Sequence, residues 1–453
     1  MIKYTVIRMT VPAIVLALST VHAAPPPEAL SGGAGTVFNT GSNAYSLPAA
    51  NLSPGRRMEF VTGNSFFNSD WVTAPAGATA RDGLGPLFNA RSCSACHTND
   101  GRGAMPADGQ PFTGILVRIS AANGQPDPIY GVQLATRALP GTEPEADATL
   151  RWTTRTETLA SGQQITLRKP EPVLTNWRYG PPAPGLLASI RLSPPVFGSG
   201  LLEAIPAAAI EALADPDDQN KDGISGRPAR VKAADGGSVL GRFGWKASQP
   251  TIPAQNAAAF HNDIGLTTST ISAPPYTTAQ AGRLDSFPNG GQPEVSDLIF
   301  HRVATYVRVL AVPARRNLED PQVKKGEAFF TQLQCAKCHT PLLATDNSSP
   351  IPELENQTIR PYTDLLLHDM GAALADNRPE GDATGAEWRT PPLWGIGLNA
   401  AVNGHTNFLH DGRAATLEEA ILWHEGEALN SKTAYAALPE SDRAALLRFL
   451  ESL

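Results

Sequence analysis

The chain has 453 residues, a formal net charge of −7 and 42% hydrophobic residues. This length allows two or three domains of about 150 residues, each with a hydrophobic core of its own. No lysine- and arginine-rich run occurs, so neither nucleic acid nor an anionic membrane surface is an expected partner. Glycine and proline number 40 each, which indicates long ordered loops between the elements.

Residues 1–23 are typical of a secretory signal. Lys3 and Arg8 supply the positive start, residues 11–21 form an apolar stretch too short to span a bilayer, and Ala23 ends a segment with small residues. We expect cleavage near Ala23 and export of the protein to the periplasm, where it would not span the membrane. A buried N-terminal helix is the alternative.

All cysteines of the chain belong to two copies of the pattern Cys-x-x-Cys-His. The copies are Cys93, Cys96 and His97, and Cys335, Cys338 and His339. This is the attachment sequence of c-type haem, because two thiols on one turn add to the two vinyl groups of one porphyrin and the adjacent histidine reaches the iron. Redox-active dithiols and a split zinc site are the alternatives. We predict two covalently bound c-type haems, whose attachment requires an exported, oxidising compartment.

Between the two motifs the sequence changes character. Residues 105–195 are rich in proline, glycine and threonine, and residues 114–120 and 164–168 alternate between apolar and polar side chains. These patterns predict loops with small strands. Beyond the two haem motifs, we find no internal repeat in the sequence.

The segment at residues 215–226 resembles a calcium loop of the EF-hand type. With Asp218 as the first ligand, Asn220 and Asp222 supply side-chain oxygens and Ile224 offers its carbonyl. The twelfth position is Ala229, so the usual bidentate glutamate is absent and a complete EF-hand is excluded. We expect Ca²⁺ in this shortened loop, and a polar turn without metal is the alternative.

Two helices are predicted before the second haem motif. Apolar residues follow helical spacing over residues 298–310, and another helix begins at Pro321 and leads into the motif, as the first helix of a cytochrome c domain does. The linker therefore falls near residues 311–320. We predict an N-terminal haem domain at residues 24–310, with loop and strand insertions, and a C-terminal cytochrome c domain at residues 311–453. The fold class is mainly α, with two cytochrome c-like haem domains and a few short strands in the N-terminal half.

Outside residues 1–23 and the two haem motifs, several side chains could occupy the sixth position of either iron. They are His261, His301, His368, His405, His410, His424, Met58, Met105 and Met370. Composition alone does not select among them, because histidine more often satisfies hydrogen bonds than binds a metal.

The sequence resembles a known family at several separate motifs. Residues 387–394, 408–413 and 416–420 resemble the last haem domain of bacterial di-haem cytochrome c peroxidases and of their relative MauG. Residues 195–206, 222–227 and 242–247 are similar to the di-haem c-type oxidoreductase family, also labelled peroxidase or thiol oxidoreductase. The resemblance covers nearly all of the chain after residue 23.

This resemblance implies a ligand for the C-terminal iron. In the peroxidase relatives the sixth ligand lies on the helix after the His-Asp-Gly motif, and the same interval from His410 reaches His424. His339 and His424 would then both bind this iron, with Met370 as the rival ligand. The relatives have methionine or tyrosine at that position, so a histidine would lower the potential of this haem and leaves the electron donor open.

The resemblance also places an acidic residue near the N-terminal haem, and Glu203 is the best match. A carboxylate there could take a proton from bound peroxide and return it to the leaving oxygen. Two alternatives stay open. Glu203 could instead satisfy backbone donors at a helix start, and His261 could occupy or gate the iron held by His97.

Further roles follow from the same resemblance. Trp245 could relay electrons between the haems, with an ordinary core tryptophan as the alternative. Arg389 is expected to neutralise a haem propionate, because a guanidinium matches a carboxylate with two hydrogen bonds. His410 and Arg413 would orient the same haem edge or stabilise the turn around Gly412.

The resemblance implies a periplasmic oxidoreductase that reduces hydrogen peroxide at the N-terminal haem with electrons relayed through the C-terminal haem. A small cytochrome c or cupredoxin is the expected donor, and the negative charge favours a basic docking partner. Two other functions remain open: oxidation of a protein or organic substrate, as in MauG or the rubber oxygenases, and electron transfer without catalysis.

Overall fold

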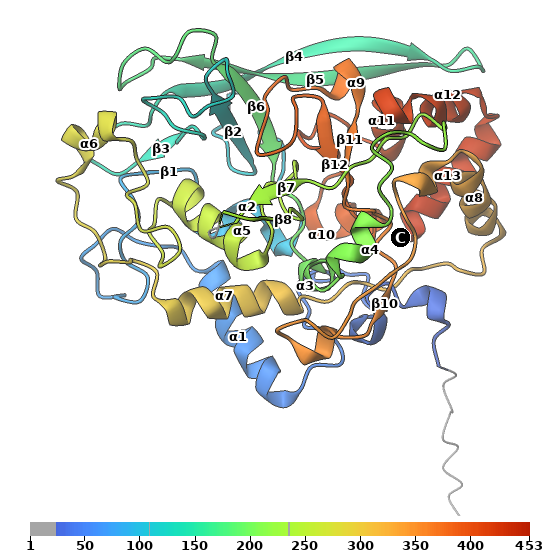
Figure 1. Ribbon diagram of the computed structural model, residues 1–453, viewed down its shortest axis with the longest axis horizontal. Helices are drawn as coiled ribbons and strands as arrows, with labels where there is room; N and C mark the ends of the chain where they lie inside the picture. The colour runs from blue at the N-terminus through green and yellow to red at the C-terminus, as the bar shows by residue number, and fades with distance from the viewer. Residues whose placement is uncertain (1–23, 108, 234–235) are drawn as a thin grey trace, which may run out of the picture.

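The computed structural model describes residues 24–107, 109–233 and 236–453, so the predicted secretory signal lies outside the described residues. The helices are α1 (Pro54–Asn68), α2 (Cys93–Cys96), α3 (Ser199–Glu203), α4 (Ala207–Glu211), α5 (Ile252–Ala259), α6 (Thr278–Leu284), α7 (Asp297–Val309), α8 (Pro321–Gln332), α9 (Gly371–Leu374), α10 (Asn399–Asn403), α11 (Leu417–Leu422), α12 (Leu429–Ala437) and α13 (Glu440–Ser452). Figure 1 shows them distributed along the whole length of the molecule.

The long helices pack as two pairs. α1 packs against α7, and α8 packs against α13. Each pair begins with a capped helix, because Ser53 and Asp320 accept hydrogen bonds from backbone N–H groups of the first turn and a proline follows at the first helical position. The two helices predicted before the second haem motif are confirmed as α7 and α8.

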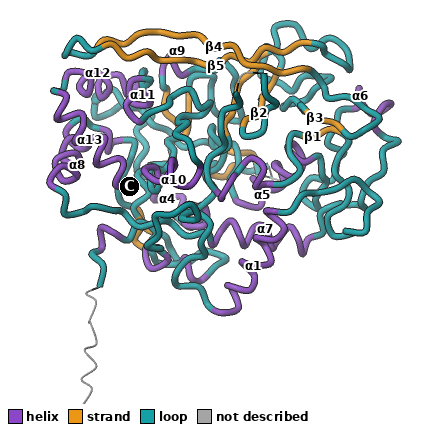
Figure 2. The backbone as a smooth tube through the Cα atoms, turned by 180° about the vertical axis from the view of Figure 1, so that it is seen from behind, coloured by secondary structure: helices purple, strands orange, loops and turns teal. Residues whose placement is uncertain are grey.

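Strands form only two-stranded antiparallel sheets in the described part of the chain. They are β1 (Leu87–Phe88) with β3 (Arg137–Ala138), β2 (Ile115–Ser120) with β6 (Leu187–Leu192), β4 (Asp147–Thr158) with β5 (Gln164–Thr175), β7 (Arg230–Lys232) with β8 (Ser238–Leu240), β9 (Leu343–Ala344) with β10 (Thr358–Ile359), and β11 (Leu367–Asp369) with β12 (Glu387–Arg389). The β4–β5 hairpin runs along one edge of the molecule (Figure 2).

The prediction of a mainly α fold is therefore correct only in part. Helices hold 31% of the residues and strands 17%, so the structure is mixed. The largest single contribution to the strand content comes from the β4–β5 hairpin, whose strands have 12 residues each, where the sequence predicted only short strands.

Two large hydrophobic clusters fill the interior. One surrounds α1, α5 and α7 and includes Trp394 from beyond residue 311. The other surrounds α8, α11 and α13 and includes Leu159 and Leu167 from the β4–β5 hairpin. Core packing thus crosses the predicted domain boundary in both directions, and the boundary itself stays a prediction.

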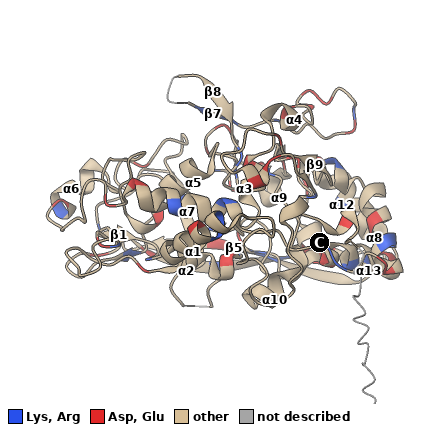
Figure 3. Ribbon diagram, turned by 90° about the horizontal axis from the view of Figure 1, so that it is seen from below, with Lys and Arg blue, Asp and Glu red and all other residues tan. Residues whose placement is uncertain are grey.

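The exterior carries both signs of charge. Figure 3 shows acidic and basic residues scattered along the ribbon, with the β7–β8 hairpin and the loop after α4 projecting together on one side. In the part of the chain that the structure describes, no helix combines the length and hydropathy needed to cross a bilayer.

The crossing of α1 over α7 depends on Gly63. A Cβ added there would lie 2.2 Å from the carbonyl oxygen of Arg302. We expect Gly63→Ala to lower the free energy of unfolding by about 1–3 kcal/mol, because backbone on both sides must move apart. Urea denaturation measures this loss.

Gly55→Ala on the same helix is the control, since nothing lies within 4 Å of its added Cβ. It should be neutral or stabilising by up to about 1 kcal/mol. Equal stability of the two variants would contradict the close approach at Gly63.

Candidate functional site

Each Cys-x-x-Cys-His motif lines a cavity of its own. The N-terminal cavity has a volume of about 280 Å³, and its wall includes His97 and both cysteines of the first motif. The C-terminal cavity has a volume of about 180 Å³, and its wall includes His339 and both cysteines of the second motif. The structure thus gives each motif a separate space beside its histidine.

His97 and His339 are oriented by the same kind of hydrogen bond. Nδ1 of His97 lies 2.7 Å from the carbonyl oxygen of Pro194, and Nδ1 of His339 lies 3.0 Å from that of Tyr362. Because a carbonyl only accepts, Nδ1 carries the proton and Nε2 keeps its lone pair for a metal. Burial lowers the pKa of both rings, and that of His339, which is also near His424, falls to about 4. Both rings are therefore neutral, as iron ligation requires.

His424 meets the same requirements in the C-terminal cavity. It lines that cavity, its Nδ1 lies 2.8 Å from the carbonyl oxygen of Ala420, and burial lowers its pKa. Met370 lines the same cavity. The structure therefore brings His339, His424 and Met370 together, and the ligation of iron by His424 stays a prediction.

His368 also lines the C-terminal cavity but is in a different chemical state. Its Nε2 is 2.8 Å from Oδ2 of Asp364 and its Nδ1 is 2.6 Å from Oε2 of Glu427. Burial opposes a charge on the ring, but hydrogen bonds to Asp364, Cys338 and Glu427 raise its pKa well above the usual value. The charged ring has no lone pair to offer a metal.

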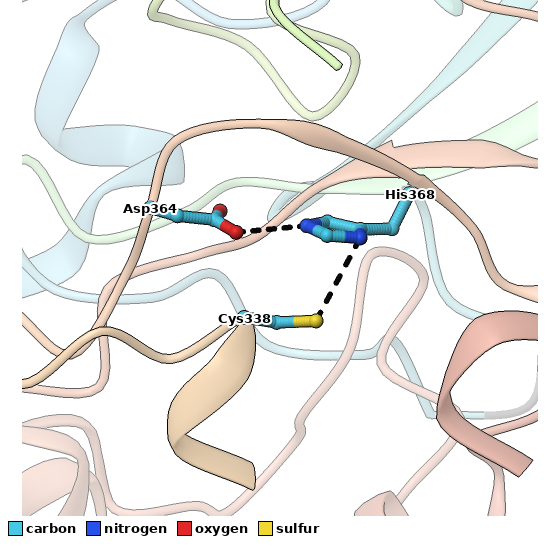
Figure 4. A group of neighbouring side chains, drawn as sticks. All are labelled: Cys338, Asp364 and His368. Carbon is cyan, nitrogen blue, oxygen red and sulfur yellow. Dashed lines mark hydrogen bonds and ion pairs between the residues drawn. The ribbon is translucent and has the colours of Figure 1, made fainter. Parts of the chain in front are cut away.

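Figure 4 shows His368 between Asp364 and Cys338. Among the described residues, these three form the group whose ligand atoms lie close enough together to hold a metal ion. We assign no metal there, because both nitrogens of His368 are engaged by carboxylates and the sulfur of Cys338 belongs to the predicted haem attachment.

Two more histidines that the sequence offers as iron ligands, His410 and His261, lie in different surroundings. His410 lines the C-terminal cavity and stacks on Trp388, with ring centroids 3.7 Å apart. His261 is absent from the wall of the N-terminal cavity, and its Nε2 is buried without a hydrogen-bond partner in the structure. Nothing in this geometry directs His261 toward the iron of His97.

Trp245 lies between the two cavities and lines both of them. Its Nε1 donates to the carbonyl oxygen of Leu192 at 2.7 Å, and its ring lies 6.5 Å from that of His410, edge to face. This position is the one that an electron relay needs. The relay role itself stays a prediction.

Arg102 and Arg389 also line both cavities, where they would be available to the propionates of a bound haem. They are 6% and 7% exposed, and burial lowers the pKa of each to about 10. Neither forms an ion pair with any described residue, and Nε of Arg102 lacks a hydrogen-bond partner. A buried cation without an anion is unfavourable, so a carboxylate from a bound group would complete both. Arg389 was expected in this role.

The sequence interpretation missed Arg102, although it follows the first haem motif closely and stands between two glycines. Arg413, by contrast, lies outside the cavity walls. It is buried and donates from Nε to both carboxylate oxygens of Asp411, at 3.0 and 2.9 Å. Of the two roles expected for it, the geometry favours stabilisation of the turn around Gly412.

Glu203 does not line the N-terminal cavity. It accepts from Nε of Arg308 at 2.6 Å and from the backbone N–H of Ile252, at the start of α5, at 2.8 Å. This arrangement favours the alternative in which Glu203 satisfies backbone donors, and an acid–base role gains no support from its position.

Two other carboxyl groups of the described residues line the N-terminal cavity. Burial raises the pKa of Asp263 to about 6, although Gln133 donates to its Oδ1 at 2.7 Å. Burial also disfavours the charge of Glu380, but Arg118, Arg191 and Arg378 hold its pKa far below the usual range. Asp263 is therefore the carboxyl group in this wall that can carry a proton near neutral pH.

The predicted calcium loop forms a compact turn. Oδ1 of Asp218 and Oδ1 of Asn220 both accept from the backbone N–H of Asp222, whose own Oδ1 accepts from the N–H of Ile224. Lys337, between the cysteines of the second haem motif, lies 3.2 Å from Oδ2 of Asp222. These contacts are those of a polar turn, and calcium binding stays a prediction.

The structure also reveals an internal repeat that the sequence interpretation missed. Residues 243–257 and 408–422 have nearly the same backbone pattern, after which α5 continues to Ala259 whereas α11 ends at Leu422. Phe243 bridges Gln249 and Phe408 bridges Ala414, at the same interval in both segments. The second and fifth positions of both segments have positive φ, at Gly244 and Ala247 and again at Leu409 and Gly412.

The repeat continues into a capped helix. Thr251 accepts from the N–H of Ala254, and Thr416 accepts from the N–H of Glu419. Of the whole segment, only the phenylalanine and this threonine are identical in the two copies, which is why residue patterns alone did not reveal it. Trp245 and His410 are equivalent positions, and both contact the backbone of Leu192.

Equivalent positions of the two helices line the two cavities. The pairs are Ile252 with Leu417, Gln255 with Ala420, Asn256 with Ile421, and Ala259 with His424. The position that gives a histidine to the C-terminal cavity therefore gives an alanine to the N-terminal cavity.

Comparison with known proteins shows which family the chain matches. The model of the family described as "Di-haem oxidoreductase, putative peroxidase" matches residues 27–124 and 184–453. No curated protein matches the chain. A solved structure of Kuenenia stuttgartiensis hydrazine synthase pressurized with 20 bar xenon is similar at 12% identity and a TM-score of 0.32, covering 98% of this chain and 100% of that chain. A likeness this weak carries no argument.

The two cavities predict a simple result for haem content. The wild-type protein should give two haems per chain in a pyridine haemochrome assay, and Cys335→Ala/Cys338→Ala should give one that remains attached after denaturation. Ser94→Ala, inside the first motif but without a thiol, should keep both. Two attached haems in the double cysteine variant would contradict the assignment.

Proposed function

The chain belongs to the di-haem oxidoreductase family, and on that premise we propose that it reduces hydrogen peroxide at the N-terminal haem with electrons that pass through the C-terminal haem. Peroxide, two electrons and two protons give two waters. We also propose that the protein is exported to the periplasm and that both haems are covalently attached through the Cys-x-x-Cys-His motifs.

The observation that carries this proposal is the difference between Ala259 and His424. The two residues occupy equivalent sequence positions of the repeat, Ala259 as the last residue of α5 and His424 two residues beyond the end of α11, and each lies in the wall of its own cavity. His424 would be a second histidine ligand for the iron held by His339, whereas the methyl group of Ala259 cannot bind iron and would leave space for a small molecule. The two irons would therefore be unequal, and the N-terminal iron would be open to peroxide.

The residues of the N-terminal cavity can assist the reaction. Bound haem would supply the iron that coordinates peroxide and the electrons that reduce it. His97 would bind that iron through Nε2, since its Nδ1 is held by Pro194. Asn256 lines the cavity with a buried Nδ2 that lacks a partner, so this amide can donate a hydrogen bond to a peroxide oxygen.

Proton delivery is better supported for Asp263 than for Glu203. Asp263 lines the cavity and has a pKa raised to about 6 by burial, whereas Glu203 lies outside the wall and pairs with Arg308. A carboxylic acid that is partly neutral near the working pH can donate a proton to the leaving oxygen.

Electrons would reach this cavity past Trp245 and Arg102, which line both cavities. The donor would be a small cytochrome c or cupredoxin, and the net charge of −7 favours a partner with a basic docking face.

Ala259→His tests the carrying observation directly. We expect a new ligand at the N-terminal iron, loss of carbon monoxide binding by the reduced protein, and loss of peroxide turnover by at least about 100-fold. Absorption and EPR spectra should show a high-spin iron converted to low spin. Ala254→His is the control, because Ala254 is on the same helix but outside the cavity wall.

Persistent carbon monoxide binding in Ala259→His would show that this position does not face the iron. Absence of carbon monoxide binding in the wild type would instead favour a protein that only transfers electrons.

The pKa of Asp263 predicts a pH dependence. Its neutral form, which can donate a proton, is present below a pH of about 6 and is lost as the pH rises through that value. The kcat/KM for peroxide should therefore fall as the pH rises through this range. In Asp263→Asn this limb should disappear and turnover should drop by about 100-fold, while Glu203→Gln keeps the limb. An unchanged pH profile in Asp263→Asn would rule out the role.

A further inference from the structure

The β4–β5 hairpin belongs to the N-terminal half of the sequence, and its turn lies against helices of the C-terminal half. Its strands pair over their whole length, from Asp147 opposite Thr175 to Thr158 opposite Gln164. The turn of the hairpin reaches the C-terminal helices near α12 (Figures 1 and 2). The family model leaves out residues 125–183, so this hairpin is not part of the pattern by which the family is defined.

Two leucine side chains near the end of the hairpin are buried in the C-terminal core. Leu159 and Leu167 are 2% and 0% exposed, and they belong to the same hydrophobic cluster as Leu422 and Trp423. The backbone N–H of Ala160 also donates to the carbonyl oxygen of Ala436 at 3.0 Å. The hairpin is therefore fixed against the helices that surround the C-terminal cavity.

Arg155 contacts the residues on both sides of His424. Its guanidinium carbon lies 4.2 Å from the centre of the Trp423 ring, and its Nη1 donates to Oε1 of Glu425 at 2.9 Å. Its Nη2 reaches the carbonyl oxygen of Leu422 at 3.5 Å. One planar side chain thus stacks on an aromatic ring and forms an ion pair, which a guanidinium does better than an ammonium group.

The backbone at His424 needs such support. α11 ends at Leu422, so His424 lies beyond the last residue held by regular helical hydrogen bonds. Its own N–H donates to the carbonyl oxygen of Ile421 at 3.1 Å in a final turn. The hydrogen bond from Nδ1 to the carbonyl oxygen of Ala420 sets the orientation of the imidazole ring, and contacts of the neighbouring side chains hold the backbone that carries it.

We propose that the β4–β5 hairpin positions the sixth ligand of the C-terminal iron and that Arg155 is the positioning residue. A second contact acts in the same direction, because Glu157 of the hairpin lies 2.9 Å from Nζ of Lys432, which lines the C-terminal cavity. The inference rests on the proposed ligation of iron by His424, but not on peroxide as the substrate.

Arg155→Ala in the intact di-haem protein tests this inference. The variant should keep both haems, while its C-terminal iron loses part of its low-spin EPR signal and binds carbon monoxide in addition to the N-terminal iron. We expect the affinity of the C-terminal iron for carbon monoxide to rise by about tenfold, because a released imidazole competes less well.

Arg151→Ala is the matched control. Arg151 lies on the same strand, and its ion pair with Glu171 at 2.6 Å stays within the hairpin, with the Arg151 side chain 69% exposed. This variant should be spectroscopically identical to the wild type. Arg155→Lys keeps the charge opposite Glu425 without a planar group over Trp423 and should give an intermediate result, which also serves if Arg155→Ala does not fold.

His424→Ala, measured beside these variants, separates the possible failures. If His424→Ala leaves the low-spin signal intact, His424 is not the ligand, and the inferred role of Arg155 is then wrong as well. If His424→Ala removes the signal but Arg155→Ala and Arg155→Lys match the wild type, the hairpin does not position the ligand. Spectra that respond as expected in a protein without peroxide turnover would overturn the proposed reaction and leave the positioning role supported.

Discussion

A hydrogen bond from Nδ1 of histidine to a backbone carbonyl is the interaction on which the rest of this account depends. It occurs at His97, His339 and His424, where it fixes the ring and leaves Nε2 unprotonated. His368, in the same cavity wall as His339, faces two carboxylates instead and carries a charge. The group that accepts the hydrogen bond from the ring therefore distinguishes the histidines that can bind iron from His368, which cannot.

The second constraint is a repeated backbone that holds different side chains. The bridged loop and the threonine-capped start of the helix recur in residues 243–257 and 408–422, so their cavity-facing positions correspond. Exchange of histidine for alanine at one of these positions would make one iron closed and the other reachable. The same repeat brings Trp245 and His410, its equivalent positions, into contact between the cavities.

Much of this organisation could be predicted from the sequence, because the spacing of Cys-x-x-Cys-His has few chemical meanings and because α7 and α8 follow clear helical patterns. The length of the β4–β5 hairpin could not. Pro170 and Pro172 interrupt the pattern of an interior strand, but a two-stranded ribbon tolerates proline where its N–H would face outward. The repeat was also hidden, since backbone bridges and positive φ angles preserve it with almost no shared residues. Glu203 matched a motif, yet its ion-pair partner Arg308 lies on α7, far away in the sequence.

The EPR spectrum of the oxidised wild-type protein is the most direct test of the central claim that the two irons are unequal. The account predicts one high-spin iron, from the cavity with Ala259, and one low-spin iron with two histidine ligands, from the cavity with His424. Two low-spin irons would contradict it, because no open coordination site would remain for peroxide.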